Sequence, residues 1–164
     1  MAQITLRGNP INTVGSLPGV GTIPQFTLTL GDLSDVDTSA YAGQKLVLNI
    51  FPSIDTAVCA NSVRRFNLEA SSLDNTTVLC VSADLPFAQK RFCGAEGLNH
   101  VAMASTFRSN FGDAWGVKLA DSGMRGLMAR AVVVLNEQGA VVFSQLVPEI
   151  AQEPDYEGAL AALR

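Results

Sequence analysis

Apolar residues gather in short runs along this chain, and the spacing of the runs predicts alternating strands and helices. Residues 45–51 and 76–83 are almost entirely apolar, which is typical of strands covered on both faces. Between them, residues 56–73 place apolar side chains at helical spacing, as an amphipathic helix requires. Strand, helix and strand therefore predict a parallel unit with a right-handed crossover.

Shorter elements are predicted on both sides of this unit. Residues 3–6 and 12–14 indicate an N-terminal β-hairpin turning through residues 7–10. Residues 26–30 alternate as a half-buried strand, and residues 32–37 are expected to form the turn that follows it. We further expect a helix that starts at Pro86 and ends at Gly94 or Gly97, a strand over 100–105, a short helix over 107–115, a hairpin over 129–147 and a helix over 154–163. Without repeats or linkers, residues 1–164 are expected to form a single α/β domain, a mixed central sheet flanked by helices.

Composition narrows the class of protein. The net charge is −4, and the longest basic cluster is the pair Arg64-Arg65, so neither nucleic acid nor a membrane surface is an expected partner. No apolar run reaches the roughly 18 residues of a membrane span, and the first residues lack the pattern of a secretory signal. Three cysteines, an odd number, suit a redox role in a reducing compartment, so we expect a cytoplasmic protein.

The stretch from Pro52 to Cys59 is the strongest candidate for chemistry. Pro52 lacks the N–H that a central strand needs, and Thr56 is a good N-cap, so Cys59 falls in the first turn of the helix. Unpaired N–H groups and the helix dipole favour an anion there. The simpler interpretation is a small buried apolar residue. In that case Pro52 would only end the strand, and Thr56 would only cap the helix.

A helix end alone is too weak to make a reactive thiolate. It contributes at most about 2 kcal/mol, whereas a cation about 4 Å away contributes about 4 kcal/mol at an effective dielectric of 20. Arg130 is the best candidate, because it lies among apolar residues 129–135 and needs a partner there. It could instead reach solvent from the strand end. Arg125 and Arg64 are weaker candidates.

The other cysteines allow several interpretations. Cys93 lies near a helix end that can fray, where it could condense with an oxidised Cys59, although it could equally be a partly buried thiol without a partner. Cys80 sits in a continuous apolar strand and is expected to be structural. Together with His100 the cysteines lack the paired spacing of a zinc site, and no Cys-x-x-Cys pair indicates a disulfide reductase. A Cys/His dyad would have to use His100, without local support.

The pattern Pro52-x-x-x-Thr56-x-x-Cys59 resembles the active-site motif of the peroxiredoxins. Residues 49–65 and 82–98 resemble the bacterial thiol peroxidase branch in particular, and the similarity runs from near Ile11 to the C-terminus. Ala57 is a departure, since relatives often carry Pro or Gly there. The resemblance implies a thioredoxin-like fold with an N-terminal hairpin.

The resemblance also implies a mechanism. The residue matching Cys59 is peroxidatic, those matching Pro52, Thr56 and Arg130 shape its pocket, and the one matching Cys93 resolves it within the same chain. It implies an antioxidant peroxidase without metal or organic cofactor, which reduces hydrogen peroxide or organic hydroperoxides, is recycled by thioredoxin and forms a homodimer. We expect the Cα atoms of Cys59 and Cys93 to lie farther apart in the reduced fold than the roughly 7 Å limit for a disulfide, so that the helix starts unwind locally in each cycle. A peroxide-sensing switch protein is the alternative function.

Overall fold

A mixed sheet forms the centre of the computed structural model, which describes residues 1–164. The strands are β1 (Gln3–Leu6), β2 (Asn9–Asn12), β3 (Thr27–Leu30), β4 (Asp35–Asp37), β5 (Lys45–Ile50), β6 (Thr76–Ser82), β7 (Ala102–Ser105), β8 (Ala131–Leu135) and β9 (Val141–Leu146). The helices are η1 (Thr38–Tyr41, a 3-10 helix), α1 (Ala57–Ala70), α2 (Pro86–Glu96), α3 (Phe111–Ala114) and α4 (Tyr156–Ala161).

The sheet has seven strands in the order β4-β3-β7-β6-β5-β8-β9, and β1 and β2 form a separate antiparallel hairpin. The predicted parallel unit is confirmed, because α1 connects β5 to β6 and the two strands pair in parallel. β6 is also parallel to β7, whereas β8 and β9 join on the other side as an antiparallel hairpin. The predicted fold class, a mixed sheet flanked by helices with an N-terminal hairpin, is therefore correct.

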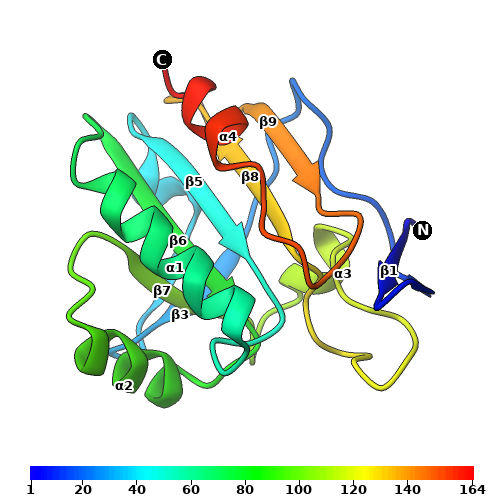
Figure 1. Ribbon diagram of the computed structural model, residues 1–164. Helices are drawn as coiled ribbons and strands as arrows, with labels where there is room; N and C mark the ends of the chain where they lie inside the picture. The colour runs from blue at the N-terminus through cyan, green and yellow to red at the C-terminus, as the bar shows by residue number, and fades with distance from the viewer.

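Helices pack against the central sheet (Figure 1), and an apolar layer lies on each face of it. Alternate residues of β5 point to opposite faces, so Leu46 and Leu48 join one layer with Trp115, near α3, while Val47 joins the other with Phe66 of α1. The second layer contains Cys59 and Cys80, and α1, α2 and α4 all contribute to it or pack against it. The thiol-bearing face of the sheet is thus the face that α1 covers.

The N-terminal hairpin differs from the prediction. Its turn is only Arg7-Gly8, with φ values of 51° and 81°, so the second strand begins at Asn9 rather than Asn12. Two consecutive left-handed residues make the tight turn that matches strand twist. Pro10 is tolerated in β2 because β1 is the only strand that pairs with it, so β2 is an edge strand.

Smaller differences concern short or charged segments. The prediction treated residues 32–37 as a turn, whereas Asp35–Asp37 pairs with β3 as the edge strand β4. The helix predicted over 107–115 is only Phe111–Ala114, and the terminal helix is shortened to Tyr156–Ala161. The α2 boundaries were predicted well, because Pro86 begins the helix and Gly97 ends it with a left-handed φ of 66°.

Candidate active site

The loop between β5 and α1 carries the first part of the site. Pro52 is buried directly after β5, and the side chain of Asp84 fixes the residues that follow it. One carboxylate oxygen of Asp84 accepts a hydrogen bond from Ser53 Oγ at 2.8 Å, and the other accepts from the Ile54 N–H at 2.9 Å. Sequence reasoning missed Asp84. Its position just after β6, the parallel neighbour of β5, could have indicated that it reaches this loop.

Thr56 occupies the predicted N-cap position of α1, but its side chain makes no capping hydrogen bond. Its hydroxyl donates instead to the Ser53 carbonyl at 3.0 Å, so the capping prediction was wrong. This local bond orients the hydroxyl toward the loop, and its oxygen accepts no hydrogen bond from the N–H groups of the first turn. Thr56 therefore stabilises the loop, and the first turn of α1 lacks a side-chain cap.

Arg130 contacts Cys59 as expected for the cation of the site. Its Nη2 donates to Cys59 Sγ at 3.3 Å, and both residues are almost fully buried, with 2% and 0% of their surface exposed. Arg130 precedes β8 rather than lying within it, and its Nε donates to the Ile150 carbonyl at 2.8 Å. The Cys59 sulfur therefore lies within hydrogen-bond distance of a buried cation.

One hydrogen-bond donor of Arg130 remains unused. Its Nη1 is buried without any partner, although buried polar groups are nearly always paired. Arg130 also lines a cavity of about 240 Å³ at the start of α1. The cavity is mostly apolar, and its walls are formed by Leu6, Arg7, Pro52, Thr56, Ala57, Val58, Met124, Arg130, Ile150 and Ala151. A small polar molecule in the cavity could accept a hydrogen bond from the unused donor.

The N-terminal hairpin helps to form this cavity, because Glu149 holds its turn. The Glu149 carboxylate accepts hydrogen bonds from the N–H groups of Ala151 and Gly8, each at 2.9 Å, and from Thr5 Oγ1 at 3.0 Å. These bonds, first the one from Ala151, lower the pKa of Glu149 to about 2. The same segment carries the Ile150 carbonyl that binds Arg130, so Glu149 connects the hairpin to the cation of the site.

Attachment of the hairpin should therefore depend on pH. The pKa of Glu149 is below its ordinary value of 4.5, so its contribution to stability is complete above that value and is lost as the pH falls toward 2. We expect Glu149→Gln to lower the melting temperature at pH 7, with the difference from wild type vanishing near pH 2. Glu137→Gln, on the β8–β9 turn, is the control and should match wild type at every pH. If the melting temperatures of Glu149→Gln and wild type change with pH in the same way, Glu149 does not hold the hairpin as described.

The two other cysteines occupy different environments. Cys80 is fully buried in β6, and burial raises its pKa to about 12, which keeps it a neutral thiol. Cys93 is partly exposed on α2, and partial burial raises its pKa as well. It lies beside a surface cavity of about 300 Å³ near the glycine-terminated end of the helix. All three cysteines are free, and Cys59 contacts Arg130 rather than Cys93.

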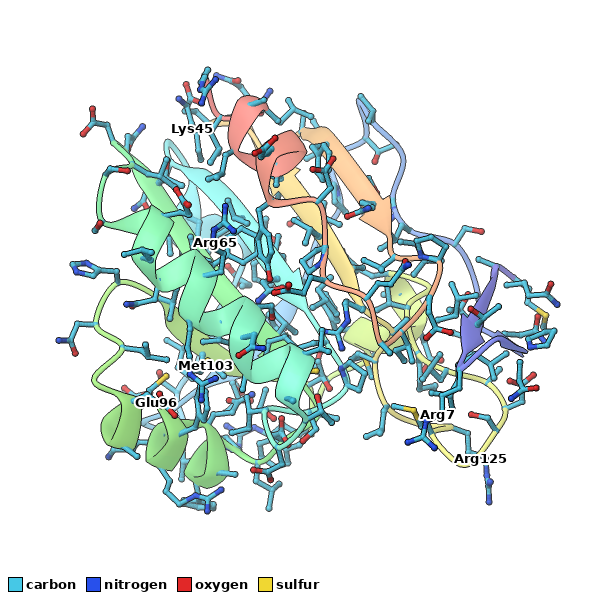
Figure 2. The ribbon with its side chains drawn as sticks, viewed as in Figure 1. Arg7, Lys45, Arg65, Glu96, Met103 and Arg125 are labelled. Atoms are coloured by element: carbon cyan, nitrogen blue, oxygen red, sulfur yellow. The ribbon has the colours of Figure 1, made fainter.

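The alternative cations and ligands lie elsewhere. Arg64 forms an exposed ion pair with Glu96 of α2 at 2.8 Å, and Arg125 extends outward from its loop (Figure 2). His100 is exposed, and no group of three or more His, Cys, Asp or Glu side chains is placed to hold a metal ion. The three cysteines and His100 therefore do not gather into such a group. None of the helices has the length and hydrophobicity needed to span a membrane.

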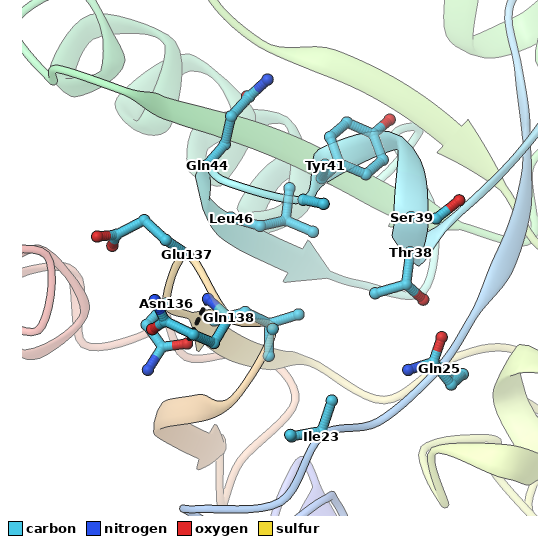
Figure 3. Close-up of a pocket in the computed structure, with 13 residues that line it drawn as sticks. Ile23, Gln25, Thr38, Ser39, Tyr41, Gln44, Leu46, Asn136, Glu137 and Gln138 are labelled. Atoms are coloured by element: carbon cyan, nitrogen blue, oxygen red, sulfur yellow. Dashed lines mark hydrogen bonds between the residues drawn. The ribbon is translucent and has the colours of Figure 1, made fainter.

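A separate pocket lies near the start of β5 and the β8–β9 turn (Figure 3). Its volume is about 230 Å³, and its lining includes Tyr41, Gln44 and Glu137. It contains no cysteine and no cationic side chain. This pocket therefore holds none of the residues that sequence analysis singled out for chemistry.

Comparison with known proteins agrees with this geometry. The Redoxin family model matches residues 20–160. The thiol peroxidase of Mycobacterium tuberculosis H37Rv is 61% identical over 164 residues, covering 99% of each chain, and that of Corynebacterium glutamicum is 54% identical with the same coverage. The chain belongs to the thiol peroxidase branch of the peroxiredoxins.

Solved structures agree with this membership. A peroxiredoxin-like protein from Aquifex aeolicus is 34% identical, with a TM-score of 0.94 over 99% of this chain and 96% of its own. The thiol peroxidase from Chromobacterium violaceum, at 17% identity, shares the fold with a TM-score of 0.91. This thiol peroxidase is accordingly an enzyme of the peroxiredoxin type, with the Redoxin match extending over all of β5, α1 and β8.

Proposed function

We propose that the enzyme reduces hydrogen peroxide and organic hydroperoxides through the Cys59 thiolate. The observation that carries the proposal is the buried contact of Arg130 with Cys59 Sγ, together with a second Arg130 donor that has no partner. One arm of the guanidinium stabilises the sulfur anion, and the other is available for a peroxide oxygen. The apolar side chains around the cavity suit the carbon chain of an organic hydroperoxide.

The first step is a displacement at oxygen. Cys59 Sγ attacks one peroxide oxygen, an S–O bond forms, the O–O bond breaks, and the leaving oxygen takes a proton to depart as water or an alcohol. Negative charge develops on that leaving oxygen, and Arg130 Nη1 can donate to it. Pro52 closes one wall of the cavity, and Thr56 lines it beside the loop. Neither a metal nor an organic cofactor is needed for this step.

The second step joins the two cysteines. Cys93 Sγ attacks the sulfur of the Cys59 sulfenic acid, an S–S bond forms, the S–O bond breaks, and hydroxide leaves as water after taking a proton. Since Cys59 is fully buried in the first turn of α1 and Cys93 lies on α2, this turn has to open for the sulfurs to meet. Cys80 remains a structural thiol.

Replacing Cys93 separates the two steps. We expect Cys93→Ser to consume about one equivalent of peroxide at a rate within about threefold of wild type and then to stop. Its turnover with a dithiol reductant should fall at least about tenfold, because no intramolecular disulfide forms. Rapid-quench peroxide assays and steady-state NADPH oxidation measure the two quantities. Undiminished turnover of Cys93→Ser would contradict the resolving role.

We further propose that thioredoxin reduces the disulfide, that residues 1–164 act as one domain, and that the enzyme is a cytoplasmic homodimer. The resemblance supports the reductant and the dimer, and three free cysteines suit a reducing compartment. The test is NADPH oxidation with thioredoxin and its reductase, using hydrogen peroxide and cumene hydroperoxide, with sedimentation for the dimer. Oxidation of Cys59 without turnover by any dithiol would favour the peroxide-sensing alternative.

A further inference from the structure

A buried polar pair lies beneath Cys59 and is not used by either step above. Asn49 is a fully buried polar residue on the α1-facing side of β5, between the apolar Val47 and Phe51, the residue that follows the strand. Its Nδ2 donates to Ser62 Oγ at 3.1 Å, and Ser62 Oγ donates to the Cys59 carbonyl at 2.8 Å. Both residues are fully buried. Burying an amide and a hydroxyl in this apolar layer is costly, so the pair calls for an explanation.

The geometry fixes the direction of the hydroxyl. Because Ser62 Oγ accepts a bond from Asn49, its own proton is free to point at the Cys59 carbonyl. Asn49 also lies 3.7 Å from Cys80 Sγ, its partner across the strands, and its Oδ1 has no hydrogen-bond partner. A polar group with one unsatisfied atom is retained here, where an apolar residue would fill the layer without that cost.

Few other side chains hold this turn of α1. Thr56 does not cap it, and Asp84 binds the loop before the helix. The contact between Arg130 and Cys59 Sγ is strongest while the sulfur is an anion, and oxidation to a sulfenic acid weakens it. After oxidation, the bond from Ser62 is the remaining buried side-chain contact to the Cys59 backbone.

We propose that Asn49 and Ser62 are positioning residues that set how readily the Cys59 turn opens after oxidation, and hence the rate of disulfide formation. This inference rests on the proposed Cys59–Cys93 disulfide. When the first turn unwinds, Cys59 leaves the helix, but Ser62, three residues later, stays in α1 and remains bonded to Asn49 of β5. Of the two side-chain bonds of Ser62, only the bond to the Cys59 carbonyl is lost together with the main-chain bonds of the turn, so it adds to the resistance to opening. The Asn49–Ser62 bond is present in both states.

The test compares the two chemical steps in Ser62→Ala. We expect the first-order rate of disulfide formation to rise about three- to tenfold, where tenfold corresponds to about 1.4 kcal/mol. The second-order rate of Cys59 oxidation should stay within about twofold of wild type, and sulfinic acid formed at high peroxide should decrease. Rapid acid quench, thiol labelling and mass spectrometry measure all three.

The chain provides a matched control on the same helix. Ser71 Oγ donates to the Leu68 carbonyl at 2.8 Å, with the same three-residue spacing, but it is exposed at the far end of α1. Ser71→Ala should therefore keep the wild-type rate of disulfide formation. Ser62→Thr retains the hydroxyl and should restore a rate near wild type. If Ser62→Ala does not fold, Asn49→Leu carries the test. Without the Asn49 donor the Ser62 hydroxyl is no longer directed at the Cys59 carbonyl, so we expect a smaller increase, of about two- to threefold.

The outcomes separate this inference from the function on which it rests. Equal disulfide rates in wild type, Ser62→Ala and Ser71→Ala, or an unchanged rate in a folded Asn49→Leu, would overturn the positioning role alone. A fall in the oxidation rate as large as the change in the disulfide rate would also overturn it, because it would indicate general damage. If wild type forms no Cys59–Cys93 disulfide, the proposed second step fails as well.

Discussion

Cys59→Ser is expected to lose at least about 10³-fold in peroxidase turnover with every peroxide and reductant. Serine keeps the size of the side chain, but its hydroxyl remains protonated and cannot form a sulfenic acid. Peroxide-dependent NADPH oxidation with thioredoxin and its reductase measures the loss.

Cys80→Ala is the matched control for this substitution. Cys80 is equally buried, belongs to the same apolar layer and has no contact with Arg130, so turnover should stay within about threefold of wild type. Its melting temperature can fall, because a buried sulfur is removed. Comparable turnover in Cys59→Ser and wild type would refute the assignment of the nucleophile.

Arg130→Met is expected to lower kcat/KM by about 10² to 10³, the usual loss when a donor to developing negative charge is removed. Two effects combine, since the thiolate loses its cation and the peroxide loses the Nη1 donor. Arg130→Lys should recover part of the loss. A lysine retains the charge, but it cannot contact Cys59 and the Ile150 carbonyl with the same planar fork.

The control for Arg130 is Arg65→Met. Arg65 lies on α1 as Cys59 does, but it is exposed and pairs with Glu69 at 3.0 Å, so kcat/KM should remain within about twofold of wild type. The effect of both substitutions on the first step is measured as the second-order rate of Cys59 oxidation, in competition with a reference peroxidase. This rate does not depend on reduction of the disulfide. A folded Arg130→Met enzyme with the wild-type rate would contradict the role of the guanidinium.

Most of the fold was predicted from the apolar runs and from the proline and glycine residues that bound helices. β5 and β6 are continuous apolar runs, and Pro86 and Gly97 bound α2, so these elements were identified with nearly correct limits. β4 was missed because a three-residue edge strand with two aspartates carries almost no periodic signal. The hairpin turn was misjudged because Arg7 adopts a left-handed conformation, which sequence patterns associate with glycine or asparagine.

Within the site, residues were predicted where their neighbours in the sequence reveal their role, and were missed where they contact segments distant in the sequence. Cys59 was predicted from the position of one residue at a helix start, and Arg130 from a charge among apolar neighbours. Asp84, Glu149 and the Ile150 carbonyl were missed, since each acts on a segment distant in the chain. The Thr56 cap was wrong because local propensity could not reveal the competing Ser53 carbonyl.

The partner of Cys59 after oxidation is the most direct test of the account. Cleavage by trypsin separates the three cysteines. Cys59 lies in peptide 46–64, Cys80 in peptide 66–90 and Cys93 in peptide 92–108. The enzyme is treated with one equivalent of hydrogen peroxide, alkylated and digested without reduction. Mass spectrometry should find peptide 46–64 linked to 92–108, with Cys80 alkylated. A link from Cys59 to Cys80, or consumption of peroxide with both Cys59 and Cys93 still alkylated, would contradict the account.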